Sequence, residues 1–208
     1  MTLPPIAIIG FAHSPNIAGS HGTTNGVEML IPCFDKLYAE LGIARTDIEF
    51  WCSGSSDYLA GRAFSFISAI DSIGAMPPIN ESHVEMDGAW ALYEAWVKIA
   101  TGEVDLALAY GFGKATAGNA DQTLTLQTDP YTVAPLHPDA RSLGALQARA
   151  GLDAGVWTEA DMAAVGARTF GGSVDELLGR EYVANPLRQH DIAPYTDAAA
   201  AVVIASER

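Results

Sequence analysis

The sequence is poor in basic residues and in cysteine. Its 208 residues include 11 Lys and Arg against 25 Asp and Glu, a formal net charge of −14 at pH 7. The basic residues form no cluster, which argues against nucleic acids and anionic membranes as partners. The two cysteines, Cys33 and Cys52, are too few for a disulfide framework. Since no charged and apolar leader precedes the first predicted strand, we expect a cytoplasmic protein with reduced thiols.

Other common signals are also missing. No apolar run approaches the length of a membrane span. Neither Cys-x-x-Cys nor His-Glu-x-x-His occurs, so we expect no metal site. The first predicted strand ends in GFAHSPN, which lacks the glycine spacing of a dinucleotide-binding loop. The loop SGSSDY lacks the Gly-x-Ser-x-Gly elbow of a serine nucleophile.

The apolar pattern predicts an α/β fold. With 49% hydrophobic residues, the chain is long enough for one domain with a substantial core. Apolar runs typical of buried strands occupy residues 5–11, 48–52, 106–110 and 197–205, and a polar extended stretch occupies residues 79–84. Helical spacing marks residues 27–41, 59–73, 88–101, 140–150, 158–170 and 174–178. This alternation is typical of a mainly parallel sheet with helices on both faces.

Two positions make sharper predictions about helix ends. Asp87 stands directly before the helix of residues 88–101, where its carboxylate can accept the free N–H groups of the first turn. Pro32 lies within the helical pattern of residues 27–41 but has no N–H to donate. We therefore expect the regular helix to start near Pro32 or to bend there.

Three stretches of the sequence carry a resemblance to a known family. INESHVEMDGAWALYEAWVKIATGEVDLALAYGFGK, ADMAAVGARTF and YVANPLRQHDIAPYTDAAAAVVIAS resemble the thiolase superfamily, in its lipid-transfer or sterol-carrier-protein-X branch. The resemblance covers nearly the whole chain and corresponds to the N-terminal half of such proteins. It implies a five-stranded mixed sheet that is mostly parallel, with the last strand antiparallel. It also implies one thiolase-like domain over residues 1–208, with a loop excursion at 115–157.

The resemblance also implies ligands and partners. Proteins of this kind handle coenzyme A thioesters, so an acyl-CoA or steroid-CoA ester is the expected ligand, with no permanently bound cofactor. A homodimer joined along the stretch at residues 79–84 is expected, although an ordinary loop there is the alternative. A small zinc-ribbon/OB-fold protein that delivers the CoA ester is a further expected partner.

The chain departs from the family at the nucleophile. The helix that starts at residue 88 normally begins with the cysteine that takes the acyl group, but no cysteine lies between Asn80 and Leu92. The resemblance then implies a carbon–carbon lyase, such as a retro-aldolase of lipid or steroid side chains, rather than an acyltransferase. The alternative is a non-catalytic acyl-CoA-binding or scaffold subunit. An acetyl-CoA acyltransferase that uses Cys52 is the least favoured function.

Four residues are candidates for catalysis. Asp87 and Glu85 lie at or near the place of the missing cysteine, where a carboxylate can act as a general base, although Asp87 is also an ordinary helix cap. His83 lies two residues before Glu85, and the two make a plausible proton-transfer pair or a structural one. Cys52 ends a strand and is either a displaced nucleophile or a small buried residue.

The ends of two predicted strands supply candidate binding residues. Ser53 and Ser55 follow the strand of residues 48–52, and Gly111, Gly113 and Lys114 follow the strand of residues 106–110. Sheets of this class bind ligands at the carboxyl ends of their strands. We therefore expect these residues to contact the substrate or its CoA group.

Overall fold

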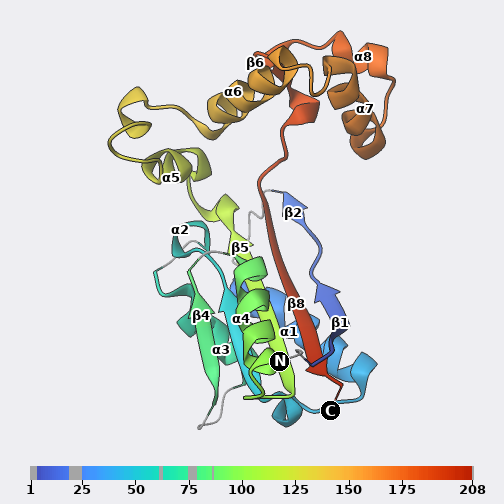
Figure 1. Ribbon diagram of the computed structural model, residues 1–208. Coiled ribbons are helices and arrows are strands. Elements are labelled where there is room, and N and C mark those ends of the chain that lie inside the picture. Colours follow the sequence, from blue (N-terminus) through green and yellow to red (C-terminus); the bar gives the residue numbers. More distant parts are fainter. Residues whose placement is uncertain (1–3, 19–24, 61–62, 75–78, 86, 208) are drawn as a thin grey trace. The chain divides into compact units, whose positions relative to one another are not determined.

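The computed structural model describes residues 4–18, 25–60, 63–74, 79–85 and 87–207. These residues form two compact units (Figure 1). The first unit contains Met1–Gly118 and Tyr195–Arg208, and the second contains Asn119–Pro194. The second unit thus begins inside the predicted loop excursion and continues past its predicted end.

The first unit is built on a mixed sheet with strand order β1-β8-β5-β3-β4. β8 runs antiparallel to β1 and to β5, while β3 is parallel to both β5 and β4. This arrangement confirms the predicted α/β fold, with a mostly parallel sheet and an antiparallel last strand. Its strands are β1 (Ile6–His13), β3 (Phe50–Gly54), β4 (Glu81–Val84), β5 (Leu106–Lys114) and β8 (Thr196–Ser206), and the short β2 (Ile17–Ala18) also pairs with β8.

Helices cover both faces of this sheet. They are α1 (Gly26–Leu41), α3 (Ser65–Ile73) and α4 (Gly88–Ala100). α1 and α3 share a hydrophobic cluster with Trp51 and Tyr110, whereas α4 shares another with Phe50 and Cys52. Trp51 and Cys52 are neighbours in β3, so their side chains point to opposite faces. The two clusters therefore lie on opposite faces of the sheet.

α1 starts earlier than the sequence suggested. Its N-cap is Asn25, whose side chain accepts the N–H of Glu28, while the Glu28 carboxylate accepts the N–H of Asn25. This reciprocal cap begins the helix at Gly26, so Pro32 lies in its interior. Of the two expectations, a regular helix that starts near Pro32 is wrong, and a bend at Pro32 stays a prediction. Gly42, with φ of 65°, ends the helix as expected.

Residues 59–73 do not form the single helix that was predicted. α2 (Asp57–Ala60) is a short separate turn, and α3 starts at Ser65. The Asp57 carboxylate accepts the N–H groups of Phe64 at 2.6 Å and Ser65 at 2.8 Å. Phe64 has φ of 54°, in the left-handed region, so the chain cannot continue a helix through it. Asp57 thus sets the start of α3, because its carboxylate caps a helix that begins eight residues later in the chain.

The second unit is mainly helical. Residues Ala145, Ala148 and Leu187 form the centre of its small hydrophobic cluster. The predicted capping pattern at Thr158 is confirmed, since Thr158 and Asp161 cap each other at the start of α7. Its helices and strands are α5 (Ala120–Leu126), α6 (Ala140–Asp153), α7 (Glu159–Phe170), α8 (Val174–Leu178), β6 (Tyr182–Ala184) and β7 (Leu187–Arg188).

Both units also contain short 3-10 turns. These occupy Arg45–Asp47, Ala115–Ala117, Ala134–Leu136 and Gln189–Asp191.

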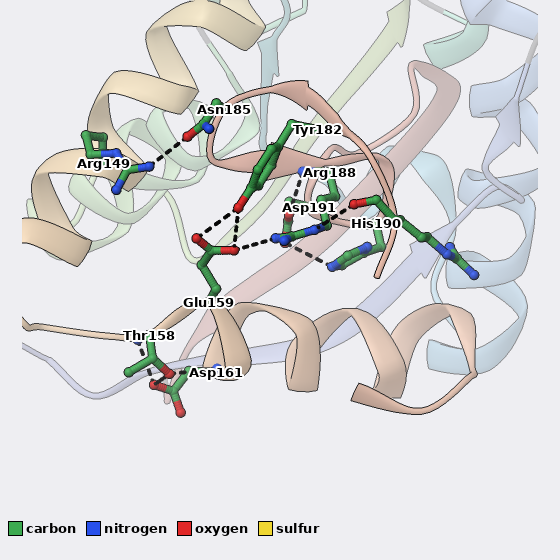
Figure 2. Close-up of polar contacts among 10 residues, drawn as sticks. Arg149, Thr158, Glu159, Asp161, Tyr182, Asn185, Arg188, His190 and Asp191 are labelled. Carbon is green, nitrogen blue, oxygen red and sulfur yellow. Dashed lines mark hydrogen bonds and ion pairs between the residues drawn. The ribbon is translucent and has the colours of Figure 1, made fainter. Parts of the chain in front are cut away.

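A polar cluster joins α7 to the β6–β7 hairpin in this unit (Figure 2). The guanidinium of Arg188 donates to Glu159 at 2.7 Å and lies over the ring of Tyr182, 4.2 Å from its centroid. The hydroxyl of Tyr182 donates to the same carboxylate at 2.9 Å. Arg188 is 6% exposed, so its charge is held inside the unit and neutralised by Glu159.

None of the helices in the described parts of the chain is long and apolar enough to cross a membrane.

Candidate functional site

A cavity of about 630 Å³ lies in the first unit, beside the first turn of α4. Residues of β5 and β8 line it, together with the end of β3, the loop that follows β3 and the first turn of α4. The carboxyl ends of β3 and β5 meet here, which is the usual ligand site of such sheets. The residues that line it include His13, Asn16, Gly54, Ser55, Ser56, Asp87, Gly88, Ala89, Leu92, Tyr110, Gly111, Phe112, Gly113, Ala198 and Ala200.

Asp87 is the N-cap residue of α4. Its Oδ1 atom accepts the N–H groups of Ala89 at 2.9 Å and Trp90 at 3.2 Å. The predicted N-cap is therefore confirmed, and a negative charge stands at the positive end of the helix dipole. Because its own carboxylate takes these N–H groups, the helix start does not offer them to a second anion.

Glycines let three backbone segments meet at this point. A Cβ atom on Gly54 would lie 2.2 Å from the carbonyl oxygen of Asp87, and one on Gly111 would lie 2.4 Å from the carbonyl oxygen of Gly54. No side chain fits at either contact. Gly88 differs, since a Cβ atom built there meets nothing within 4 Å. Position 88, at the start of α4, therefore has room for a side chain but carries none.

The polar side chains of the cavity come from three segments. His13 ends β1, and its Nδ1 atom lies 2.8 Å from the carbonyl oxygen of Ser14. Asn16 follows it three residues later and also lines the cavity. Ser55 is buried, and its hydroxyl oxygen lies 2.9 Å from that of Ser65. With Asp87, these groups supply one carboxylate, one imidazole and several neutral hydrogen-bonding groups.

His83 and Glu85 contact each other, as the sequence suggested, but on the α3 side of the sheet. The Oγ atom of Ser53 lies 2.6 Å from His83 Nδ1, and His83 Nε2 lies 3.2 Å from the Glu85 carboxylate. The ring of Phe66 in α3 stacks on His83, with 4.7 Å between centroids. Glu85 also accepts the N–H of Asp57 at 2.8 Å. This chain of contacts ties β4 to the loop that follows β3.

Two ionisable groups beside this chain of contacts, Tyr110 and Asp57, have shifted pKa values. Burial raises the pKa of the Tyr110 phenol, nearby Glu81 raises it further, and a hydrogen bond with Ser53 opposes both. Burial raises the pKa of Asp57, but the N–H groups of Ser65 and Phe64 outweigh it, so that carboxyl has a lowered pKa. Asp57 is thus held ionised as the cap of α3.

Cys52 lies in the cluster beneath α4 and is 0% exposed. Burial, followed by the charge of Glu94, raises the pKa of its thiol to about 12. A thiol in this state is protonated at neutral pH and is a poor nucleophile. Cys33 is also buried, 2% exposed, inside the cluster under α1.

Lys114 pairs within the protein. Its Nζ atom lies 3.8 Å from the carboxylate of Asp197, which is 1% exposed. The same carboxylate accepts the N–H of Thr116 at 3.1 Å and its hydroxyl at 2.6 Å. Lys114 therefore balances a buried charge at the end of β5.

The structure brings together four of the residues proposed from the sequence: Asp87, Ser55, Gly111 and Gly113 line the cavity. Ser53, His83 and Glu85 form the separate chain of contacts described above, and Cys52 is buried under α4. His13 and Asn16 line the cavity but were not proposed. His13 could have been proposed from the sequence, because it follows the first predicted strand just as Ser53 follows the second.

The described residues contain no group of three or more His, Cys, Asp and Glu placed to hold a metal ion.

Comparison with known proteins identifies the fold. No family model matches the sequence. No curated protein matches it either. Among solved structures, the acetyl-CoA acetyltransferase of Bacillus anthracis matches with a TM-score of 0.77 and 13% identity, over 99% of this chain and 66% of that one.

Two other matches are named for different activities. The Ltp2-ChsH2(DUF35) aldolase matches with a TM-score of 0.72 and 15% identity, over 99% of this chain and 57% of that one. Human mitochondrial 3-ketoacyl-CoA thiolase in complex with CoA matches with a TM-score of 0.73 and 11% identity, over 98% of this chain and 65% of that one. The chain thus spans 57 to 66% of the length of these structures. It has the fold of a thiolase-like half, as predicted.

Proposed function

We propose that this chain binds a CoA thioester in the cavity beside α4 and takes part in cleaving or forming a carbon–carbon bond, without a covalent acyl intermediate. The observation that carries the proposal is the start of α4. There Gly88 offers space but no thiol, and Asp87 places a carboxylate at the cavity wall. The lipid-transfer branch of the thiolase-like proteins, and a lipid or steroid acyl group, are part of this proposal.

Cys52 does not fit the role of acyl acceptor. It is buried beneath α4, and its thiol is protonated at neutral pH because its pKa is about 12. Of the described residues that line the cavity, none is a cysteine. Acyl transfer through a thioester on this chain is therefore the least supported of the chemistries that thiolase-like folds carry out.

A retro-aldol cleavage needs groups that the cavity contains. A base takes the proton from the β-hydroxyl of the acyl-CoA, the bond between the α and β carbons breaks, and a carbonyl product leaves. The electron pair moves onto the α carbon and the thioester oxygen, and a proton then returns to the α carbon. Asp87 or His13 is the candidate base, and the Asn16 amide is a candidate donor to the thioester oxygen.

Two of the structural matches support this proposal. One is named as an aldolase and pairs two proteins, and another holds CoA. We extend both features to this chain: a CoA ester as ligand, and a zinc-ribbon/OB-fold protein as a possible donor of that ester. A homodimer joined along β4, whose outer edge is unpaired within the described sheet, also belongs to the proposal.

A non-catalytic role is the second candidate. The Asp87 carboxylate already accepts two N–H groups at the start of α4. Both N–H groups bond to Oδ1, so this oxygen is already engaged as the helix cap. A chain that binds the CoA ester and presents it to a catalytic partner would need no base of its own.

Calorimetric titration with CoA and with a branched β-hydroxyacyl-CoA, followed by product analysis, tests these alternatives. We expect binding of the ester, release of a carbonyl product, and no acyl group on the intact chain by mass spectrometry. Binding without product would favour the non-catalytic role. An acyl adduct on Cys52, or no binding of any CoA ester, would contradict the proposal.

A further inference from the structure

The α4 face of β8 carries smaller and smaller side chains toward the cavity. Every second residue of β8 lies on this face, and the series runs from Ile204 and Val202, which pack with α4, to two alanines. The residues of β5 that lie opposite them change from alanine to glycine in the same direction. We call the last two pairs the bare floor, since all four residues line the cavity: Gly111 with Ala200, and Gly113 with Ala198.

Glycines of two kinds lie in this cavity. Gly54 and Gly111 are required by the protein itself, because a Cβ atom on either would meet a backbone oxygen. Gly88 and Gly113 are not: a Cβ atom on either meets no described atom within 4 Å, and neither residue has a left-handed φ. Glycine also destabilises a helix or a strand relative to alanine. The backbone and the packing of the described residues therefore give no reason for glycine at these two positions.

The candidate bases lie around the bare floor. His13 pairs with Ala200, which pairs in turn with Gly111, so these three residues form one row on the α4 face. The Cα atom of Gly88 lies 3.8 Å from the point where a Cβ atom of Gly111 would stand. Asp87 precedes Gly88 and lines the same cavity. One end of the row thus carries His13, and the other end lies under the helix start that Asp87 caps.

We infer that Gly88 and Gly113 are specificity-determining residues, which leave room for substituents on the acyl carbon atoms that react. This inference rests on the CoA ester proposed above as the ligand. A base acts only within hydrogen-bond reach of its proton, so a β-hydroxyl held by Asp87 or His13 places the β carbon over the bare floor. Gly88 then lies against that carbon from the helix, and Gly113 lies against it from the strand, roughly 7 Å beyond Gly111.

The bare floor selects by shape rather than by polarity. Neither glycine nor alanine has a side chain that can form a hydrogen bond, whereas a ligand can approach a glycine backbone closely. A methyl group added at position 88 or 113 therefore takes the space of a methyl group on the β carbon. One methyl group in a site of this kind changes binding by about 10- to 200-fold.

Calorimetric titration with butyryl-CoA and 3-methylbutyryl-CoA tests this inference. The two esters differ by one methyl group on the β carbon, and neither has the β-hydroxyl that cleavage needs, so the experiment measures binding alone. We expect Gly88→Ala and Gly113→Ala each to weaken binding of the methylated ester by at least about tenfold and of butyryl-CoA by less than about threefold. Binding of free CoA should not change.

Gly118→Ala is the matched control, because a Cβ atom there also meets nothing within 4 Å but Gly118 does not line the cavity. It should bind both esters like the unmodified chain, and all three variants should keep the far-ultraviolet circular dichroism of that chain. An unmodified chain that binds neither ester would overturn the proposed function and this inference with it. Esters that bind with a ratio of affinities that Gly88→Ala and Gly113→Ala leave unchanged, or that Gly118→Ala shifts equally, would overturn this inference alone.

Discussion

The Oδ1 atom of Asp87 accepts the backbone N–H of Ala89 at 2.9 Å, at the first turn of α4. The same carboxylate lines the cavity that we propose as the ligand site. One side chain therefore has a structural role that any good N-cap residue can fill and a proposed chemical role that needs a carboxylate. Two substitutions separate these roles.

We expect Asp87→Ala to lower the free energy of unfolding by about 1 kcal/mol, because it removes the side-chain acceptor at the helix start. Asp87→Asn should cost less than about 0.5 kcal/mol, since asparagine caps helices nearly as well as aspartate. Urea denaturation followed by circular dichroism measures both changes. Equal losses for the two variants would show that the charge, rather than the cap, stabilises α4.

The Asp87→Asn variant then tests the chemistry. If Asp87 is the base of a lyase, turnover should fall by about 10² to 10⁴ while the affinity for the CoA ester changes little. A variant that keeps full turnover would move the role of base to His13. This comparison is meaningful only because the cap survives the substitution.

The contact between Gly54 and Asp87 makes a second prediction. We expect Gly54→Ala to destabilise the protein by about 3 kcal/mol or more, because the new methyl group would lie 2.2 Å from a backbone oxygen that cannot rotate away. Gly113→Ala is the matched control in the same cavity, since a Cβ atom there meets nothing within 4 Å. Its cost should stay within about 0.5 kcal/mol by the same denaturation experiment. Similar losses for both variants would contradict the close contact.

The fold was largely predictable because its signals are local. The apolar runs of β5 and β8 and the helical spacing of α4 are visible in the sequence, and Asp87 and Gly42 mark helix ends by well-known chemistry. The start of α3 was not predictable in this way. It depends on Asp57 reaching Phe64 seven residues later, and only the folded chain brings the two together.

The candidate site was predictable only in part, for a related reason. Residues at strand ends were expected to meet, and Ser55, Gly111 and Asp87 do line one cavity. The side of the sheet on which each side chain lies depends on register. Ser53 follows Cys52 by one residue and so points to the α3 side, where it contacts His83 instead of the cavity.

The contact between Ser53 and His83 makes a third prediction. We expect Ser53→Ala to lower the free energy of unfolding by about 1 kcal/mol, because it removes a partner from a partly buried imidazole. Affinity for the CoA ester should not change, because the contact lies outside the cavity. The control is Glu85→Gln, where the side chain is 47% exposed and the loss should stay below about 0.5 kcal/mol. A large loss of turnover at unchanged stability in Ser53→Ala would instead assign this group a chemical role.

The buried thiols make a fourth prediction. Cys52 is 0% exposed and has a pKa of about 12, so we expect it to resist a thiol reagent in the native protein and to react only on unfolding in urea. Gly88→Cys supplies the control, because position 88 has open space around its Cβ atom. This variant should gain one thiol that reacts at once under native conditions. Rapid native modification of Cys52, located by peptide mass spectrometry, would contradict the burial on which the proposed chemistry depends.

The pairing of Glu159 with Arg188 makes a prediction about pH. The hydrogen bond from Arg188 is the main reason that the pKa of Glu159 lies below its ordinary value of 4.5, although burial opposes it. A carboxyl with a lowered pKa in the folded state stabilises that state above its ordinary pKa, and the stabilisation is lost as the pH falls through the lowered value. We therefore expect α7 and the β6–β7 hairpin to lose protection from hydrogen exchange below about pH 4.5.

Glu159→Gln should remove this part of the pH dependence and cost about 2 to 3 kcal/mol at neutral pH, because it leaves the buried Arg188 without a counter-charge. The control is Glu176→Gln, which breaks an exposed pair with Arg180 in which the side chains are 59% and 45% exposed. That change should cost less than about 0.5 kcal/mol. Hydrogen exchange followed by mass spectrometry of α7 peptides measures the local stability of the second unit in both variants. If the two substitutions reduce protection equally, the buried charge of Arg188 does not depend on Glu159, and the second unit is held together by its apolar cluster alone.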